Sequence, residues 1–273
     1  MKLMKPARAA GLVVLMVVAA CTRPDMEKRV RVTGASTLYP VLVMAGEELQ
    51  KYKGITVAAQ AGGSSRGFED TVAGRNDMGA MARELTPEEE AQVKKFPVAL
   101  DGIGIVVHAT NPVPRLTTED LRRIYRKDEH NWRAFGGPDV EIVVVNKAAG
   151  HATLESFLEY TGLKRSELAV DVVGGDNAQV IRVVENTKNA IGYVSLGEVL
   201  HSIENGLPLR LVPLDGVEPT LETVASRTYP MYRTLYLISR EEPQGASRVL
   251  LDFLTTDEAG RRVIERGKYI PFH

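Results

Sequence analysis

Three short segments of this sequence carry the glycines, hydroxyl groups and backbone amides that an anion site needs. They are residues 34–40 (GASTLYP), residues 62–67 (GGSSRG) and residues 146–153 (NKAAGHAT). Glycine lets the backbone approach an anion closely, and serine or threonine hydroxyls donate hydrogen bonds without adding charge. Together the three segments predict an oxyanion site, although each one alone is also typical of a surface turn.

Each segment lies between a predicted strand and a predicted helix. The strand-like runs are residues 30–33, 55–60 and 141–145, and the helix-compatible runs are 39–52, 68–73 and 153–160. The first turn of a helix leaves backbone N–H groups without intrahelical partners, and its dipole favours a negative ligand. The wide spacing of the segments along the chain suits a cleft between two lobes.

Several further motifs occur in an order that points to one family. Together with the first two segments, the markers are residues 76–80 (NDMGA), 101–107 (DGIGIVV), 131–132 (NW) and 189–195 (NAIGYVS). From Val30 to its C-terminus the sequence resembles the phosphate-binding, substrate-binding proteins of bacterial phosphate ABC transporters. That resemblance implies the α/β, two-lobe periplasmic binding protein fold (type II), with two mixed sheets, flanking helices and a ligand cleft between the lobes.

Breaks in the sequence suggest where the chain passes between lobes. Proline-containing turns lie at residues 111–114 (NPVP) and 228–230 (TYP). The predicted division has four parts: residues 1–20 as signal peptide, 21–28 as tether, 29–108 with 232–273 as lobe 1, and 109–231 as lobe 2.

The N-terminus has the layout of a secretory signal. Lys2, Lys5 and Arg8 precede an apolar run at residues 11–18, which is too short to span a bilayer comfortably. Residues 18–21 (VAAC) resemble a bacterial lipobox, which implies cleavage before Cys21 and lipid attachment there. An ordinary cleaved signal with an incidental cysteine is the alternative. Either reading places the protein outside the cytoplasm, and the lipobox reading anchors it to a membrane.

Composition narrows the function classes. The chain has 273 residues, is 44% hydrophobic and 25% charged, and carries a formal net charge of −1. Loss of residues 1–20 removes three basic and no acidic residues and leaves about −4. No basic block dominates, so nucleic-acid binding is not expected. An anion must therefore be held by local donors rather than by overall charge.

The first two segments match the family pattern closely. The resemblance implies that Ser36, Thr37 and Leu38 bind the ligand from the first segment, through hydroxyls and backbone N–H groups. It assigns the same role to three residues of the second segment: Ser64, Ser65 and Gly67. Helix N-capping is the alternative role for these serines and threonine.

The third segment departs from that pattern, which places an arginine before a Gly-Ser-Gly-Thr run. Lys147 replaces the arginine and provides a point charge instead of a bidentate fork. His151 and Ala152 replace a serine and a glycine, while Thr153 is kept. We expect ligand contacts from Lys147, His151, Ala152 and Thr153. A solvated charge for Lys147 and a plain loop residue for His151 are the alternatives.

A second departure concerns ligand selectivity. Ala82 stands where many family members carry a serine or aspartate. A carboxylate there would accept the proton that phosphate carries and sulfate lacks, so the identity of the oxyanion stays open.

The sequence therefore predicts a lipid-anchored, monomeric protein that passes phosphate or a related oxyanion to the permease subunits of an ABC transporter. An oxyanion sensor or scavenger of the same fold, without a permease, is the first alternative. A hydrolase is the second, but it needs a nucleophile with an oriented base. No acidic residue is evident in the sequence that would orient His151 as a base for Ser64, and no paired histidine spacing is present. We therefore expect no catalytic residue, metal or cofactor.

Overall fold

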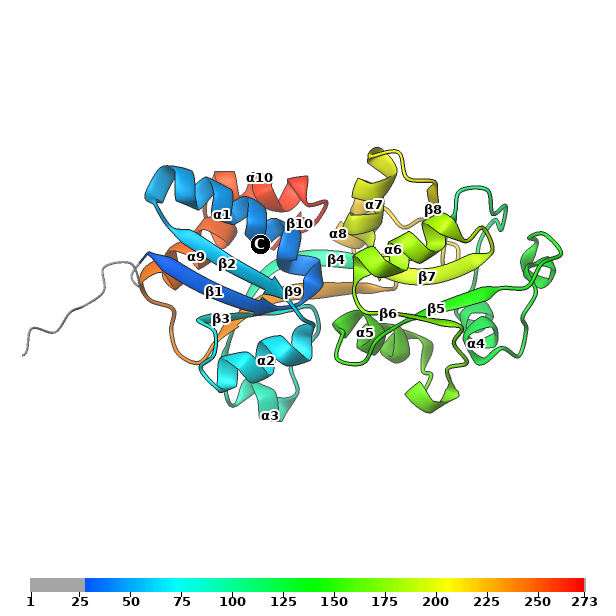
Figure 1. The fold of residues 1–273 in the computed structure, drawn as a ribbon, viewed down its shortest axis with the longest axis horizontal. Helices are drawn as coiled ribbons and strands as arrows, with labels where there is room; N and C mark the ends of the chain where they lie inside the picture. The colour runs from blue at the N-terminus through cyan, green and yellow to red at the C-terminus, as the bar shows by residue number, and fades with distance from the viewer. Residues whose placement is uncertain (1–27, 273) are drawn as a thin grey trace, which may run out of the picture.

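The computed structural model describes residues 28–272, so the predicted signal peptide, Cys21 and nearly all of the tether lie outside the described residues. Within that range, no helix is both long and apolar enough to cross a membrane. Ten strands of the described chain join in one mixed sheet, whose main path runs β2-β1-β3-β9-β4-β7-β5-β6. Helices flank the sheet on both faces (Figure 1).

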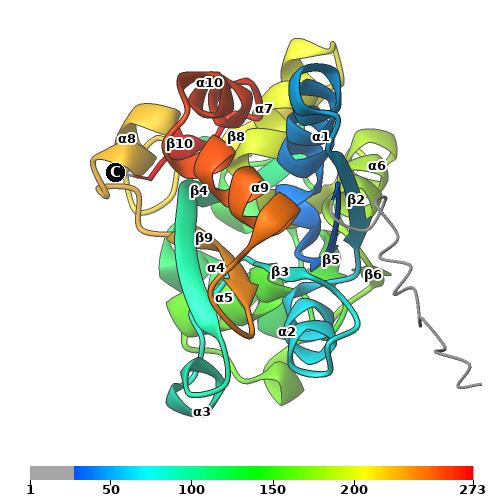
Figure 2. The same ribbon diagram turned by 90° about the vertical axis from the view of Figure 1, so that its left-hand side faces the viewer.

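We call the N-terminal side of the sheet its first end. Parallel pairing joins β1 (Arg29–Gly34) to both β2 (Thr56–Ala61) and β3 (Met78–Met81). Helices α1 (Tyr39–Lys53), α9 (Gly245–Thr255) and α10 (Glu258–Arg266) lie on one face, and α2 (Ser64–Val72) and α3 (Pro87–Glu90) lie on the other (Figure 2). A 3₁₀ turn, η1 (Ser36–Leu38), precedes α1.

Two long antiparallel strands, β4 (Lys94–His108) and β9 (Tyr232–Ser239), cross the middle of the molecule (Figure 1). Up to Gly102, β4 pairs with β9, and at residues 99–100 it also pairs with β10 (Ile270–Pro271). From Ile103 onward β4 pairs with β7 and β8 instead. The two predicted sheets are therefore continuous, because one strand is long enough to belong to both.

The second end of the sheet is formed by β5 (Val143–Lys147), β6 (Val172–Gly174), β7 (Ala190–Ser195) and β8 (Leu209–Val212). Its helices are α4 (Thr118–Arg126), α5 (Ala152–Thr161), α6 (Asn177–Asn186), α7 (Leu196–Glu204) and α8 (Leu221–Ala225), with 3₁₀ turns η2 (Trp132–Phe135) and η3 (Arg165–Glu167).

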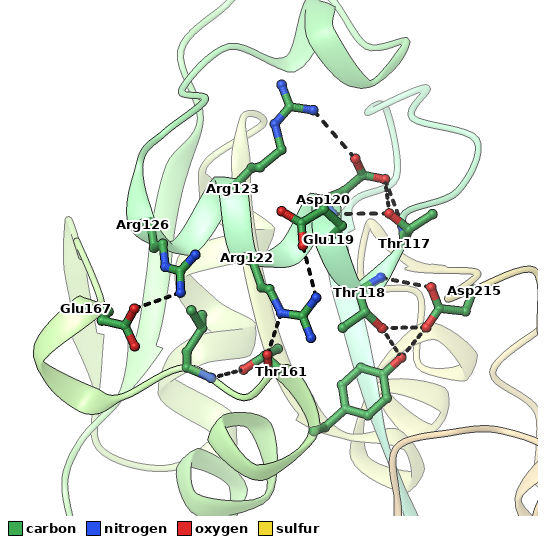
Figure 3. Close-up of polar contacts among 12 residues, drawn as sticks. Thr117, Thr118, Glu119, Asp120, Arg122, Arg123, Arg126, Thr161, Glu167 and Asp215 are labelled. Carbon is green, nitrogen blue, oxygen red and sulfur yellow. Dashed lines mark hydrogen bonds and ion pairs between the residues drawn. The ribbon is translucent and has the colours of Figure 1, made fainter.

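Helix α4 shows how these elements are fixed at the surface. Thr117 and Asp120 form a capping box at its start, and Asp215 accepts hydrogen bonds from the backbone and side chain of Thr118 (Figure 3). Near its C-terminus Arg126 pairs with Glu167 at 2.7 Å. These contacts tie α4 to two neighbouring loops.

Each end of the sheet has its own buried cores on the two faces. At the first end, one core includes Val32 and Leu250 and the other includes Met81. At the second end, Phe157 belongs to one core and Val180 to the other. The mixed α/β fold with flanking helices is confirmed, whereas the lobe boundaries at 108/109 and 231/232 stay a prediction.

Two predicted helices have different bounds from those expected. Residues 86–89 (TPEE) have the sequence pattern of a capping box with proline at the first helical position, which predicts a helix to about Lys95. In the structure α3 ends at Glu90 and β4 begins at Lys94. Helix α3 buries no residue, so side-chain packing does not stabilise a longer helix. The residues from Lys94 onward instead form backbone hydrogen bonds with strand β9. In the second segment, α2 begins at Ser64 rather than Phe68.

Candidate anion site

The backbones of the three predicted segments are packed against one another. The N–H groups of Gly62 and Gly63 donate to the carbonyl of Gly34, at 2.9 and 3.0 Å, which joins the first two segments. The Ser65 N–H points to the carbonyl of Gly150 at 3.4 Å, which joins the second and third. A Cβ on Gly63 would lie 2.5 Å from that same oxygen, and Gly63 has a φ of +87°. Only glycine fits there.

Three hydroxyl side chains, one from each segment, are buried at this junction. Thr37, Ser64 and Thr153 are exposed by only 2%, 0% and 4%. Ser64 Oγ accepts from the Ala82 N–H at 3.1 Å, and the Thr37 and Thr153 hydroxyls each accept from Arg233 at 3.0 Å. Because each oxygen already accepts from a group that can only donate, its own hydrogen is left for another acceptor. Each hydroxyl therefore keeps its hydrogen free to donate, which suits an oxyanion.

The helices behind these hydroxyls begin without side-chain caps. This holds for η1, α2 and α5, whereas Asp176 caps α6 and Thr117 caps α4. Ser64 is the first helical residue of α2, after its N-cap Gly63, so N-capping is not its role. The first-turn N–H groups of α2 and α5 thus add positive potential at the junction.

Lys147 lies at the end of β5 and is 2% exposed. Its Nζ has no hydrogen-bond partner among the described residues. Burial lowers its pKa to about 7, against the opposing charges of Glu198 and Asp176. The solvated-charge interpretation of Lys147 is therefore wrong. A buried ammonium without a partner costs folding energy, and an anion beside it would offset that cost.

Glu198, in the first turn of α7, titrates in the same range as Lys147. Burial raises the pKa of its carboxyl to about 7, although the amide of Asn177 donates to it and the charge of Lys147 acts in the opposite direction.

Sequence reasoning missed the most buried ion pair of the junction. Arg233 Nε and Nη2 donate to Asp101 Oδ2 at 3.1 and 2.9 Å, and the side chains are 4% and 0% exposed. The two residues are direct cross-strand partners on β9 and β4. Ser195 Oγ also donates to Asp101 at 2.9 Å. Burial raises the pKa of the Asp101 carboxyl, and Arg233 acts against that shift. The sequence signal that could have identified Asp101 and Arg233 is a charged residue beside each of two strongly apolar strands.

The remaining predicted residues lie around this cluster. His151 is the N-cap of α5, and burial followed by the charge of Lys147 lowers its pKa. Ala152 is buried and packs into the core of the first end, so the start of α5 is seated against that end. Ser36 and Ser65 are partly exposed.

The backbone N–H groups of Leu38 and Gly67 already have partners. Leu38 donates to Ala35 at 3.2 Å, and Gly67 donates to Gly63 at 3.1 Å. Their contacts to a ligand, like those of all the predicted site residues, stay a prediction.

Two charged residues near Ala82 in the sequence, Asp77 and Arg83, have structural partners. Arg83 forms a bidentate pair with Glu89 at 2.7 and 2.8 Å, and Asp77 accepts from the backbone and side chain of Arg31. Two grooves reach the cluster: one of about 500 Å³ is lined partly by Arg233, and one of about 620 Å³ partly by Glu198 and Tyr269. Residues 28–272 contain no group of three or more potential metal ligands.

Comparison with known proteins places these features in a family. A model described as the PBP superfamily domain matches residues 20–258. The phosphate-binding protein PstS of Borreliella burgdorferi is 28% identical over 260 residues, covering 90% of this chain and 91% of the relative. PstS of Bacillus subtilis is 24% identical over 244 residues, covering 88% and 79%.

The same class appears among solved structures. A Clostridium perfringens structure, described as a phosphate ABC transporter substrate-binding protein with bound phosphate, aligns with a TM-score of 0.84 and 29% identity, covering 90% of this chain and all of that one. An ABC-type phosphate transport receptor from Vibrio cholerae aligns with a TM-score of 0.69 and 26% identity, covering 89% and 99%.

Proposed function

The chain belongs to the PBP superfamily, and from this premise we propose that it is a substrate-binding protein that captures phosphate, or a related tetrahedral oxyanion, for an ABC transporter. The observation that carries the proposal is the buried junction of three segments. It combines three hydroxyls whose hydrogens are free to donate with an unpartnered ammonium. The names of the relatives, which are phosphate-binding and phosphate-transport proteins, support the choice of ligand.

The charges of the junction favour an anion over a neutral solute. Asp101 neutralises Arg233, so their pair contributes no net charge. Among the described residues of the junction, Lys147 is the cation that no ion pair neutralises, and its Nζ is free to donate. Burial raises the pKa of the neighbouring Glu198 carboxyl, which favours its neutral form and limits how far it offsets that charge. Charge-assisted hydrogen bonds are about twice as strong as neutral ones, so Lys147 and the hydroxyls together provide a site for an oxyanion and not for a sugar or a cation.

Each predicted residue takes a role in this proposal. Thr37, Ser64 and Thr153 donate from buried hydroxyls, and Lys147 supplies the charge. Ser36, Ser65 and His151 are secondary donors at the edge of the site, while Leu38, Gly67 and Ala152 shape it through backbone and packing.

The rest of the proposal follows from the predicted organisation of the chain. Two lobes, 29–108 with 232–273 and 109–231, close on the anion, and β4 and β9 connect them. The protein is held outside the cytoplasm by lipid at Cys21 and delivers its ligand to permease subunits. It is a binding protein and not an enzyme, as its relatives are.

Calorimetry on the purified protein tests this function. Phosphate, arsenate, sulfate, molybdate and tungstate are titrated into wild type, Ser64→Ala and a control variant, Ser166→Ala, whose serine is exposed on η3. We expect at least one oxyanion to bind wild type and the control equally, and Ser64→Ala more weakly. Binding of none of the five anions to wild type would contradict the proposed function.

A further inference from the structure

We propose that Arg233 is the positioning residue of the anion site: from the crossing strand β9 it orients the hydroxyls of Thr37 and Thr153, one from each end of the sheet, so that both donate to the bound anion. The inference rests on the proposed function and adds a residue that none of the three predicted segments contains.

The guanidinium of Arg233 is held in one orientation. Nε and Nη2 both donate to Asp101 Oδ2, which fixes one edge of the planar fork. Asp101 is fixed in turn by its cross-strand position and by the Ser195 hydroxyl. The other N–H groups of Nη1 and Nη2 then point in set directions, and Thr153 Oγ1 and Thr37 Oγ1 lie along them at 3.0 Å each.

This arrangement restricts which way the two hydroxyls point. A threonine hydroxyl alone rotates and can offer an anion either a hydrogen or a lone pair. Arg233 can only donate, so it occupies a lone pair of each threonine and leaves the hydrogens for the anion. The donors are thus set before the ligand arrives, which lowers the ordering cost of binding. A second support fixes Thr37, whose carbonyl accepts from the Tyr269 hydroxyl at 2.8 Å.

The same geometry links the ligand to lobe closure. Thr37 precedes α1 at the first end, and Thr153 lies in the first turn of α5 at the second end. Arg233 contacts both at once only when the two ends are as close as they are here. Opening of the proposed cleft must break one of the two bonds. An anion that accepts from both hydroxyls therefore stabilises the closed form.

Arg233→Lys is the first test, because lysine keeps the charge but loses the fork. One ammonium cannot hold Asp101 and both threonines in the same geometry. We expect the phosphate Kd to rise about tenfold or more, on the scale of a lost charge-assisted hydrogen bond.

Arg210→Lys is the matched control. Arg210 is a partly buried arginine whose Nη2 donates to the carbonyls of Asn111 and Val113, away from the site. Its replacement should lower thermal stability but leave the phosphate Kd unchanged. A purely structural Arg233 would behave like Arg210, so equal phosphate affinity in Arg233→Lys and wild type would overturn the inference.

A double-mutant cycle gives a readout that a structural role would not change. Thr37→Val and Thr153→Val should each weaken phosphate binding in wild type and have a smaller effect in the Arg233→Lys background. Additive effects would refute the coupling. If Arg233→Lys does not fold, the cycle between the two threonine variants replaces it. Additivity there also rejects the inference, since the two hydroxyls communicate through Arg233.

The outcomes separate the two proposals. Failure of wild type to bind any oxyanion removes the proposed function. Normal phosphate binding by wild type together with normal binding by Arg233→Lys removes only the role of Arg233.

Discussion

Replacing Lys147 with methionine tests whether the buried ammonium destabilises the fold and strengthens anion binding. Methionine has a similar length and no charge. Burial lowers the pKa of Lys147 from 10.5 to about 7. At 1.36 kcal/mol per pKa unit, that shift corresponds to roughly 4–5 kcal/mol of lost stability near neutral pH. The shift already includes the opposing charge of Glu198, and removal of Lys147 leaves that buried carboxyl without its cation, so we expect Lys147→Met to gain only about 1–2 kcal/mol.

The sign of the pH dependence follows from the same shift. The folded protein binds the lysine proton more weakly than the unfolded chain, so the penalty is complete below pH 7 and is lost as the pH rises toward 10.5. The stability advantage of Lys147→Met over wild type should therefore shrink between pH 7 and pH 10. Urea unfolding across that range, with Lys188→Met as an exposed control, measures it.

The ligand should reverse the penalty. An anion beside Lys147 raises its pKa again, so binding at pH 8 should take up protons, which calorimetry in buffers of different ionisation enthalpy detects. Lys147→Met should bind phosphate more weakly and show less proton uptake. A variant that is less stable than wild type without ligand, yet binds phosphate equally well, would refute this account of Lys147.

Four further predictions concern the site, the closure and the anchor. Ser64→Ala should raise the oxyanion Kd about tenfold by calorimetry, because a buried donor is lost; unchanged affinity for every oxyanion would mean the site is misplaced. His151→Gln should bind phosphate like wild type between pH 7 and 8, because glutamine keeps a donor and the lowered pKa of His151 leaves its imidazole neutral there; a wild-type affinity that falls with rising pH more steeply than that of His151→Gln would show that His151 binds in its charged form. Small-angle scattering should give a smaller radius of gyration with saturating phosphate, and an identical radius would argue against lobe closure. Cys21→Ser should abolish lipid labelling, and persistent labelling would exclude Cys21 as the attachment site.

Local patterns were enough to predict the elements that carry the site. The strand, turn and helix around residues 34–40 appear in the structure as β1, η1 and α1, because apolar periodicity and small turn residues act over a few positions. The predicted length of α3 is wrong because it depends on contacts with residues far away in the sequence. A capping box predicts where a helix begins. It does not predict that the residues after the helix will pair with strand β9, which is distant in the sequence.

Burial of charged groups could not be predicted in the same way. Arg233 and Asp101 are 132 residues apart, and their pairing depends on the register of two crossing strands. From the sequence alone, Lys147 fits either a solvent-exposed charge or a ligand contact. Its burial follows from the position of β5 within the sheet. Sequence identifies loops that carry donors, but the cations that complete an anion site are selected by tertiary contacts.

The arrangement of charges explains how a site without the family's third-segment arginine can still suit an oxyanion. The two functions of an arginine, planar orientation and positive charge, are divided here between two residues. Arg233 provides the fork, but Asp101 cancels its charge; Lys147 provides the charge, but has no fork. Burial lowers the pKa of Lys147 and raises that of Glu198, so rising pH acts to remove positive charge from one and to add negative charge to the other. Both changes act against a bound anion, so we expect oxyanion affinity to fall with rising pH more steeply than it would with an arginine in the third segment, which calorimetry across pH would measure.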